Sequence, residues 1–510
     1  MSPAEKSSRT EQIEIERKYD VDGLAQVPDL AGVGTVASCS LAEPVALRAV
    51  YFDTAEQVLL ANRITVRRRE GGHDEGWHVK LPGGSGARRE VHAPLGADPG
   101  EPLPAALRRV VEVVLRGRPL HPVLVLATKR TVTRLLDVDG DELAELADDE
   151  VTATAPAAES SHSWREWEVE LAPGVARSDG EALLDEVGDR LERAGASASA
   201  SKSKLARGLG EPLPGALTLV PAEVEPGSAA EFVLGGVGRL VDDLKALDAG
   251  VRDGEAEAVH RFRTTIRRLR SILRVYRGVV DSESSALLGD ALARVGRAAG
   301  STRDLQVAGD ELDLDLNAAP EGFVAHETVG RLRAGLREAS REAGRDLERD
   351  LDDASYFELL DRLDVLLATE PTGPAASDGA TKFAAARLAK EAKRARRRAE
   401  VATVAYRETG DCDPAVVHSA RKAARRLRYA IEAQRAAGLK GALSPKASHA
   451  LQDALGAALD AGAAAERFVA AAHTARWAGE DTFGYGVLAT LASARRDAAL
   501  ARLPKLAEKL

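Results

Sequence analysis

The sequence of 510 residues predicts an α+β protein with two domains. We expect an N-terminal eight-stranded antiparallel β-barrel that encloses a tunnel, and a C-terminal all-α domain of two repeated helical bundles. Three observations predict this. Short runs of alternating polar and apolar residues occupy about 11–172, and from about 228 onward the chain is rich in Ala, Leu, Arg and Glu. One pattern of His and Arg occurs once in each half of the helical region.

Eight segments read as strands because their side chains alternate and because Gly, Pro and Asp separate them. In the first, EQIEIERKY, Glu14, Glu16 and Lys18 share one face. The others are ALRAVYFDT, RITVRRRE, GWHVKLP, ARREVHAPL, ATKRTVTRLLDV, DELAELADDEV and WREWEVEL. Eight strands can close a barrel. Helices are expected at about 104–117 and 180–195, and SKSKLARGL predicts a short basic helix at the end of the region.

Composition changes predict the domain boundaries. Residues 1–10 are expected to be disordered, 11–210 to form the barrel domain, and 211–227, with the sequence EPLPGALTLVPAEVEPG, to form a linker. Residues 228–510 form the predicted helical domain. The segment ATEPTGPAASDGAT, 368–381, divides it into halves at about 228–367 and 382–510, each with about four helices.

The predicted barrel has a charged interior, since alternate residues of a closed barrel point inward. An apolar core cannot hold so many charges, so this face is either solvated or encloses a highly charged ligand and a metal. Basic positions lie on the third, fourth and sixth strands, and acidic ones mainly on the first, seventh and eighth. This division favours cations that bind phosphate on one wall and carboxylates that bind Mg²⁺ or Mn²⁺ on the other. The inward set is Glu14, Glu16, Lys18, Arg67, Arg69, Lys80, Arg88, Glu90, Arg130, Arg134, Glu145, Asp149, Glu166, Glu168 and Glu170.

The repeated pattern places one His and three Arg on one face of a helix, at offsets of 3, 7 and 10 residues. Like charges on one face repel each other, so their repetition favours a polyanionic ligand. The two copies are His260-x-x-Arg263-x-x-x-Arg267-Arg268-Leu269-Arg270 and His418-x-x-Arg421-x-x-x-Arg425-Arg426-Leu427-Arg428.

Composition restricts the function classes. A net charge of −10 argues against a general nucleic-acid coat, yet His260–Arg277 holds seven Arg and no acid. Few aromatic residues accompany the two motifs, which also disfavours nucleic acid. Two distant cysteines exclude a disulfide framework. Without an apolar signal core or an eighteen-residue apolar run, we expect a soluble cytoplasmic protein without membrane association.

Over about residues 11–210 the sequence resembles the CYTH family of triphosphate tunnel metalloenzymes. The resemblance rests on Glu14-x-Glu16-x-Lys18 together with YFDT (51–54), VRRR (66–69), VKLP (79–82), EWEVE (166–170) and SKSK (201–204). It implies an eight-stranded barrel that cleaves triphosphates with a divalent metal. Glu14, Glu16 and Lys18 would be catalytic, and Lys204 would close one end of the tunnel and contact substrate. The implied metal ligands are Glu14, Glu16, Glu166 and Glu168, and the phosphate contacts Lys18, Arg67, Arg69, Lys80 and Arg130.

Over about 228–510 the sequence resembles the CHAD family of helical domains. Besides the His-Arg motifs, GSTRDLQV (300–307) is followed in the second half by LQDALGAALDA (451–461), which retains an acid at Asp460 but has no counterpart of Arg303. The resemblance implies binding of inorganic polyphosphate between the half-bundles. For the two histidines, a structural hydrogen bond and metal binding remain alternatives to phosphate contact. The expected contacts are His260, Arg263, Arg267, Arg270, Lys390, Lys393, Arg397, His418, Arg421, Arg425 and Arg428.

Together these patterns predict metal-dependent hydrolysis of inorganic triphosphate in the barrel and polyphosphate binding by the helical domain, in the cytoplasm or at polyphosphate granules. One alternative is a non-catalytic protein that docks on polyphosphate. Another is a CYTH enzyme that acts on an organic triphosphate, either thiamine triphosphate or, as an adenylate cyclase, ATP.

Overall fold

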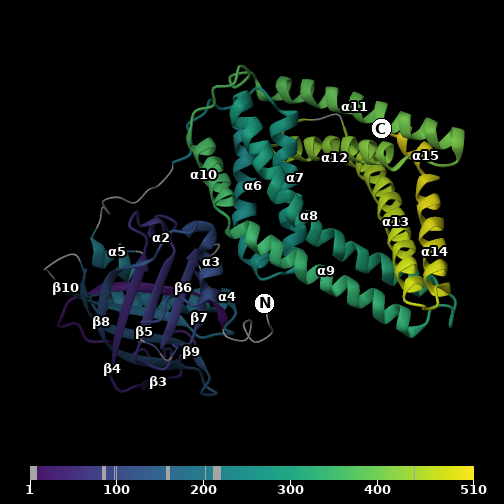
Figure 1. The fold of residues 1–510 in the computed structure, drawn as a ribbon. Helices are drawn as coiled ribbons and strands as arrows, with labels where there is room; N and C mark the ends of the chain where they lie inside the picture. Colours follow the sequence, from purple (N-terminus) through teal and green to yellow (C-terminus); the bar gives the residue numbers. More distant parts are fainter. Residues whose placement is uncertain are drawn as a thin grey trace. The chain divides into compact units, whose positions relative to one another are not determined.

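A computed structural model describes residues 9–510 except 83–87, 97, 99, 157–160, 202, 211–219 and 441–442. It divides into two compact units, Met1–Thr218 and Leu219–Leu510, and the α+β class is confirmed: a curled antiparallel sheet precedes a helical region (Figure 1). Most of the N-terminal segment expected to be disordered and most of the expected linker lie outside the described residues, as does Lys202 of SKSK.

The first unit is a sheet whose two ends meet. The hydrogen-bonded order of its strands is β1-β7-β6-β5-β4-β8-β9-β10-β2-β11, with β3 beside β8. Only Ile15 separates β1 from β2, so one nearly continuous strand pairs with β7 through its first half and with β10 through its second. The strands are β1 Thr10–Glu14, β2 Glu16–Val21, β3 Ser38–Leu41, β4 Val45–Asp53, β5 Thr65–Glu70, β6 Gly76–Pro82, β7 Arg88–Ala93, β8 His121–Leu136, β9 Glu142–Thr154, β10 Ser161–Leu171 and β11 Ser197–Ala198.

All eight expected strands are present, the first of them divided into β1 and β2. Two further strands, β3 and β11, were not expected. All four residues of β3 are exposed, so this strand carries no alternating apolar pattern to predict it. β11 has only two residues, and it was missed for that reason.

The apolar core of this unit lies outside the curl, between the sheet and helices α2 Val58–Ala61, α3 Ala105–Leu115 and α4 Arg177–Arg193. On β5, Val66 packs against the α3 side, whereas Arg67 and Arg69 point to the enclosed cavity. α4 approaches the sheet closely: a Cβ at Gly188 would lie 2.3 Å from the Tyr19 hydroxyl, so any larger residue would have to displace that side chain. The alternation thus leaves the interior free for charged side chains.

The second unit consists of helices in two similar halves. Each half has four long helices followed by a shorter one, close to the four that the sequence predicts. The first half contains α6 Ala229–Arg252, α7 Ala256–Val275, α8 Ser282–Ala318, α9 His326–Asp352 and α10 Ala354–Ala368. The second contains α11 Ala380–Thr409, α12 Pro414–Ala436, α13 Pro445–Trp477, α14 Phe483–Leu500 and α15 Leu503–Ala507.

The two halves are joined where their first helices begin. Ser228 caps α6 by accepting from the Glu231 amide at 3.2 Å, and it forms a β-bridge with Gly379, which precedes α11. The next helices of each half, α7 and α12, pack on each other and carry the two His-Arg motifs. Among the described helices of either unit, none has the length and apolar character that a membrane span requires.

Candidate functional site

The curled sheet encloses a cavity of about 410 Å³ with a charged lining. Nearly every barrel residue predicted from the sequence to bind metal or phosphate lines it; Glu166 does not. The basic lining residues are Lys18, Arg67, Arg69, Lys80, Arg88, Arg130 and Lys204. The acidic ones are Glu14, Glu16, Asp74, Glu90, Glu142, Glu145, Glu168 and Glu170.

Strand order separates these charges into two walls. β9, β10 and the joined β1 and β2 are consecutive neighbours and supply most of the carboxylates. β6, β5, β4 and β8 are also consecutive; β6, β5 and β8 supply Lys80, Arg67, Arg69 and Arg130, while β4 contributes Tyr51 and apolar side chains. The cavity therefore offers cations to an anionic ligand on one side and carboxylates to a metal on the other.

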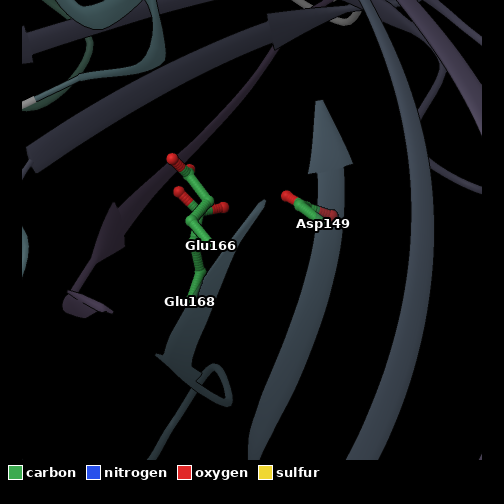
Figure 2. Close-up of side chains that lie close together, drawn as sticks. All are labelled: Asp149, Glu166 and Glu168. Atoms are coloured by element: carbon green, nitrogen blue, oxygen red, sulfur yellow. The ribbon is translucent and has the colours of Figure 1, made fainter. Parts of the chain in front are cut away.

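One end of the acidic wall contains a buried group of three carboxylates. Ligand oxygens of Asp149, Glu166 and Glu168 lie within 4.8 Å of one another, and Figure 2 shows the three side chains converging from β9 and β10. Their hard oxygen donors suit Mg²⁺ or Mn²⁺. In the structure, however, the Lys204 Nζ lies 3.0 Å from Asp149, 2.6 Å from Glu166 and 2.7 Å from Glu168.

Lys204 thus acts as a built-in cation for this group. Although burial lowers the pKa of its ammonium, Glu168, Asp149 and Glu166 raise it above the ordinary value. Arg130 adds a bidentate pair to Asp149, at 2.8 and 2.6 Å, and a contact of 3.0 Å to Glu168. A metal can enter the centre of the three carboxylates only if Lys204 withdraws. Sequence analysis assigned Lys204 to substrate and missed this ion pairing, which depends on where α5, Lys204–Leu209, lies in three dimensions.

A second group of carboxylates, Glu14, Glu16 and Glu170, also lines the cavity. Glu170 on β10 and Glu16 on β2 are opposite each other in the strand register. Lys80 donates a hydrogen bond to Glu14 at 2.6 Å. Burial, then the charges of Glu14, Glu16 and Glu145, raise the pKa of Glu170 to about 8 despite the lowering effect of Lys80. The excess of negative charge makes this group suitable for a divalent cation. Glu170 belonged to the predicted inward set but not to the predicted metal ligands.

On the basic wall the cations lie close to one another, although Arg69 also forms an ion pair with Asp74. Burial and the neighbouring cations Arg67 and Arg130 lower the pKa of Arg69 to about 9. Arg67 lies 3.9 Å from Glu90, and Glu90 also contacts His78 Nδ1 at 2.8 Å. Phosphate oxygens would offset this positive charge with charge-assisted hydrogen bonds. His78 was not predicted, since a single histidine in a strand carries no distinctive spacing.

In the helical unit the two motifs make equivalent ion pairs. Arg263 lies 3.0 Å from Asp304 on α8, and Arg421 lies 3.6 Å from Asp460 on α13. Asp460 is the acid that the sequence comparison found retained in the second repeated element. These pairs neutralise one part of the surface where α7 and α12 meet.

The next motif arginines, Arg267 and Arg425, come together from the two copies. Burial and the charge of Arg267 lower the pKa of Arg425 to about 10, with Arg421 and Arg263 contributing further. Burial lowers the pKa of Arg267 as well, and Arg263, Arg421 and Arg428 add to the effect. Such cations gain stability from a bound anion.

The predicted polyphosphate contacts differ in whether they line a cavity and in how exposed they are. Arg267, Arg270 and Arg425 line a cavity of about 870 Å³. The side chain of His260 is partly buried, and within the described residues its Nδ1 has no hydrogen-bond partner; His418 is exposed. Arg428 pairs with Glu432 at 3.1 Å. Lys390, Lys393 and Arg397 are exposed on α11 and are not part of the cavity lining.

Two protein families match the chain. The CYTH domain matches residues 12–209, and the CHAD domain matches residues 236–508. Uncharacterised proteins from two strains of Mycobacterium tuberculosis are 35% identical over 525 residues, with 99% of this chain and 99% of each relative covered.

Two solved structures resemble one part of the chain each. The CHAD domain of the plant Ricinus communis is 22% identical and covers 57% of this chain and 95% of its own, with a TM-score of 0.43. A Hippeastrum adenylyl cyclase candidate, described as having a dominant triphosphatase activity, is 15% identical and covers 38% and 92%, with a TM-score of 0.24. Scores this low add nothing to the two domain matches. On those matches, the chain belongs to the proteins that join an N-terminal CYTH domain to a C-terminal CHAD domain.

Proposed function

We propose that the CYTH domain hydrolyses inorganic triphosphate with Mg²⁺ or Mn²⁺ and that the CHAD domain binds inorganic polyphosphate. CYTH proteins are metal-dependent triphosphatases or cyclases. The observation that carries the proposal is the cavity with one cationic and one acidic wall. A triphosphate with its metal needs both walls at once.

The cavity residues would act mainly by position and charge. In phosphoryl transfer the transition state is loose, so a protein contributes chiefly by positioning the groups and stabilising charge. Arg67, Arg69 and Lys80 would bind phosphate oxygens, and Glu14 and Glu16 would hold the metal or orient the attacking water. The metal, when bound, polarises the scissile phosphoryl group.

Ion pairs inside the cavity explain how these charges remain buried without ligand. Lys18 contacts Glu168 and lies 3.2 Å from Glu16, and Lys80 contacts Glu14. Unpaired buried charges would be costly. A metal–triphosphate complex carries charges of both signs, so it can exchange with these pairs and leave each side chain with an opposite partner.

For the helical unit, the arginines at the crossing of α7 and α12 support a phosphate polymer. Arg makes forked hydrogen bonds to phosphate oxygens. The aromatic residues near the motifs are Phe262, Tyr276 and Tyr429, and each is at most 2% exposed. These three buried rings therefore cannot stack with nucleic-acid bases, which favours polyphosphate over nucleic acid.

The test of the enzyme assignment is a double variant, Glu14→Ala with Glu16→Ala. Phosphate release from tripolyphosphate with Mg²⁺ or Mn²⁺ should fall by about 100-fold or more, because metal positioning contributes several kcal/mol to phosphoryl transfer. An exposed acid on α4, Glu181, provides the control Glu181→Ala, which should keep full activity. Unchanged turnover in the double variant would remove the active-site assignment.

A substrate panel separates the alternatives. Tripolyphosphate, thiamine triphosphate, ATP and long-chain polyphosphate would be compared at several metal concentrations. Faster turnover of thiamine triphosphate, or conversion of ATP into a cyclic product, would favour an organic substrate. Polyphosphate binding without turnover of any compound would favour a docking protein.

A further inference from the structure

The two copies of the His-Arg motif differ at positions between and just beyond their shared residues. Aligning His260 with His418 pairs Arg277 with Arg435 but Arg274 with Glu432. The same alignment pairs Thr264 with Lys422. The helical unit therefore repeats its arginines without repeating their surroundings.

Glu432 neutralises the end of the surface that belongs to the second copy. It accepts a hydrogen bond from Arg268 at 3.2 Å and forms an ion pair with Arg428 at 3.1 Å. Both guanidiniums also lie over the Tyr429 ring, at 5.6 and 4.9 Å from its centre. These contacts engage two motif arginines with partners from the protein itself.

The end where the first copy meets the connection between the halves stays cationic, with cations from both copies. Its cavity of about 870 Å³ is lined by eight Lys or Arg side chains and a single carboxylate, Asp290. Within the described part of the chain, Arg426 alone of the eight has a carboxylate within 4 Å, with Glu391 at 3.5 Å. The eight are Arg267, Arg270, Arg274, Arg277, Arg387, Lys422, Arg425 and Arg426.

The connection between the two halves helps to build this cavity. The Gly373 amide donates to the Val279 carbonyl at 2.9 Å, and the Ala375 amide donates to the Gly278 carbonyl at 2.7 Å. These bonds fix the connection on the turn between α7 and α8, and Pro374 then lines the cavity. Since the chain has one such connection, the second copy cannot acquire the same wall.

Helix α8 closes the cavity with its first turns. Ser282 and Ser285 line it, and Asp281 caps the helix by accepting from the Ser284 amide at 2.8 Å. The positive end of the helix dipole and the two hydroxyl groups are suited to phosphate oxygens. Cations from α7, α11 and α12 surround the same space.

We propose that this cavity is the main phosphate site of the helical unit and that it takes a compact linear oligophosphate, either free or as the end of a longer chain. The inference rests on the proposed polyphosphate binding and makes that binding asymmetric. A terminal phosphate carries more negative charge than an interior one near neutral pH, because its second proton leaves near pH 6. A cavity whose cations come from three helices can surround such a group, whereas a row of cations on one helix face contacts it from one side only.

The test compares two arginines of the cavity with an arginine that the repeat places at the equivalent position of the second copy. Binding of long-chain polyphosphate would be measured by calorimetry for the full chain and for Arg274→Ala with Arg277→Ala. Both side chains are exposed, so the fold should persist. We expect the affinity to fall about tenfold or more, since hydrogen bonds to charged groups are the strong ones. The control, Arg435→Ala, is the counterpart of Arg277 and should change the affinity less than twofold.

Competition with tripolyphosphate distinguishes the two sources of the ligand. If tripolyphosphate displaces the long chain, and does so less well in the double variant, the cavity accepts free oligophosphate. If tripolyphosphate does not compete, and the affinity for long-chain polyphosphate depends on the concentration of chain ends, the cavity binds the ends of long chains. Equal losses in the control and the double variant would overturn the asymmetry, whereas absence of polyphosphate binding in the unaltered chain would overturn the proposed function itself.

Discussion

At the scale of single residues, the sequence predicted the face on which Glu170 lies but not the pKa of its carboxyl. Alternation along EWEVE placed Glu166, Glu168 and Glu170 on one face, and the structure directs Glu168 and Glu170 to the cavity. Periodicity could not rank these acids, because the pKa of Glu168 and that of Glu170 depend on neighbours from other elements. Glu168 has a pKa well below its ordinary value since, despite burial, Lys18, Lys204 and Arg130 surround it. Glu170 faces other carboxylates instead.

The raised pKa of Glu170, about 8, predicts pH-dependent metal binding. Below that pH the folded protein holds a proton that a divalent cation must displace, so affinity for Mg²⁺ should rise about tenfold per pH unit from pH 6 and level off above 8. Without metal, the same proton stabilises the fold at low pH, and this contribution is lost as pH rises towards 8. Calorimetric titration with Mg²⁺ at several pH values measures how steeply the affinity for Mg²⁺ rises with pH.

Glu170→Gln provides the comparison for this slope. It removes the titrating group, so affinity should be lower and nearly independent of pH, whereas Glu181→Gln on the exposed face of α4 should behave like the unaltered chain. A slope that survives in Glu170→Gln would show that another group releases the proton.

At the scale of elements, the strands of the sheet were predictable because their apolar side chains face the helices and their charged side chains face the cavity, which produces an alternating sequence. Val66 and Arg67 illustrate this, since one side faces the helices and the other the cavity. β3 was not predictable, because an exposed strand needs no such alternation. In the same way the motif predicted one helical face, but only the fold determines that Arg263 and Arg421 have acidic partners whereas Arg267 and Arg425 lie near each other.

The short helix α5 yields a prediction about the three buried carboxylates that Lys204 neutralises. Lys204→Met should destabilise the metal-free protein by about 3–5 kcal/mol, the usual cost of removing one partner from a buried ion pair. A divalent metal should restore much of the loss, because it can occupy the place of the ammonium. Urea unfolding with Mg²⁺ and with a chelator measures both effects. The control is Lys129→Met, which removes an exposed lysine 3.5 Å from Glu150. Equal destabilisation with and without metal would exclude a metal site at these carboxylates.

At the scale of the whole molecule, the net charge of −10 conceals two groups of cations that suit anions. One lies on the basic wall of the cavity inside the sheet, and the other lies where α7 and α12 meet. A ligand that binds only the folded state stabilises it by about 2.7 kcal/mol at a concentration of 100 times its Kd. Because the two units are separately compact, each should respond to its own ligand. Composition predicted a basic region in the helical unit, at His260–Arg277, whereas the cations inside the sheet were predicted from the alternation along its strands. Neither pattern could assign a given ligand to one unit.

Calorimetric unfolding tests this division of roles. Tripolyphosphate with Mg²⁺ should raise the Tm of one transition, and long-chain polyphosphate should raise the Tm of the other. Arg425→Ala should abolish only the second shift; without ligand it should cost little stability, since it removes a guanidinium whose pKa burial and Arg267 already lower to about 10. Arg435→Ala serves as its control. If both ligands raised the same transition, or if Arg425→Ala kept the polyphosphate shift, the assignment of the polymer to the helical unit would be wrong.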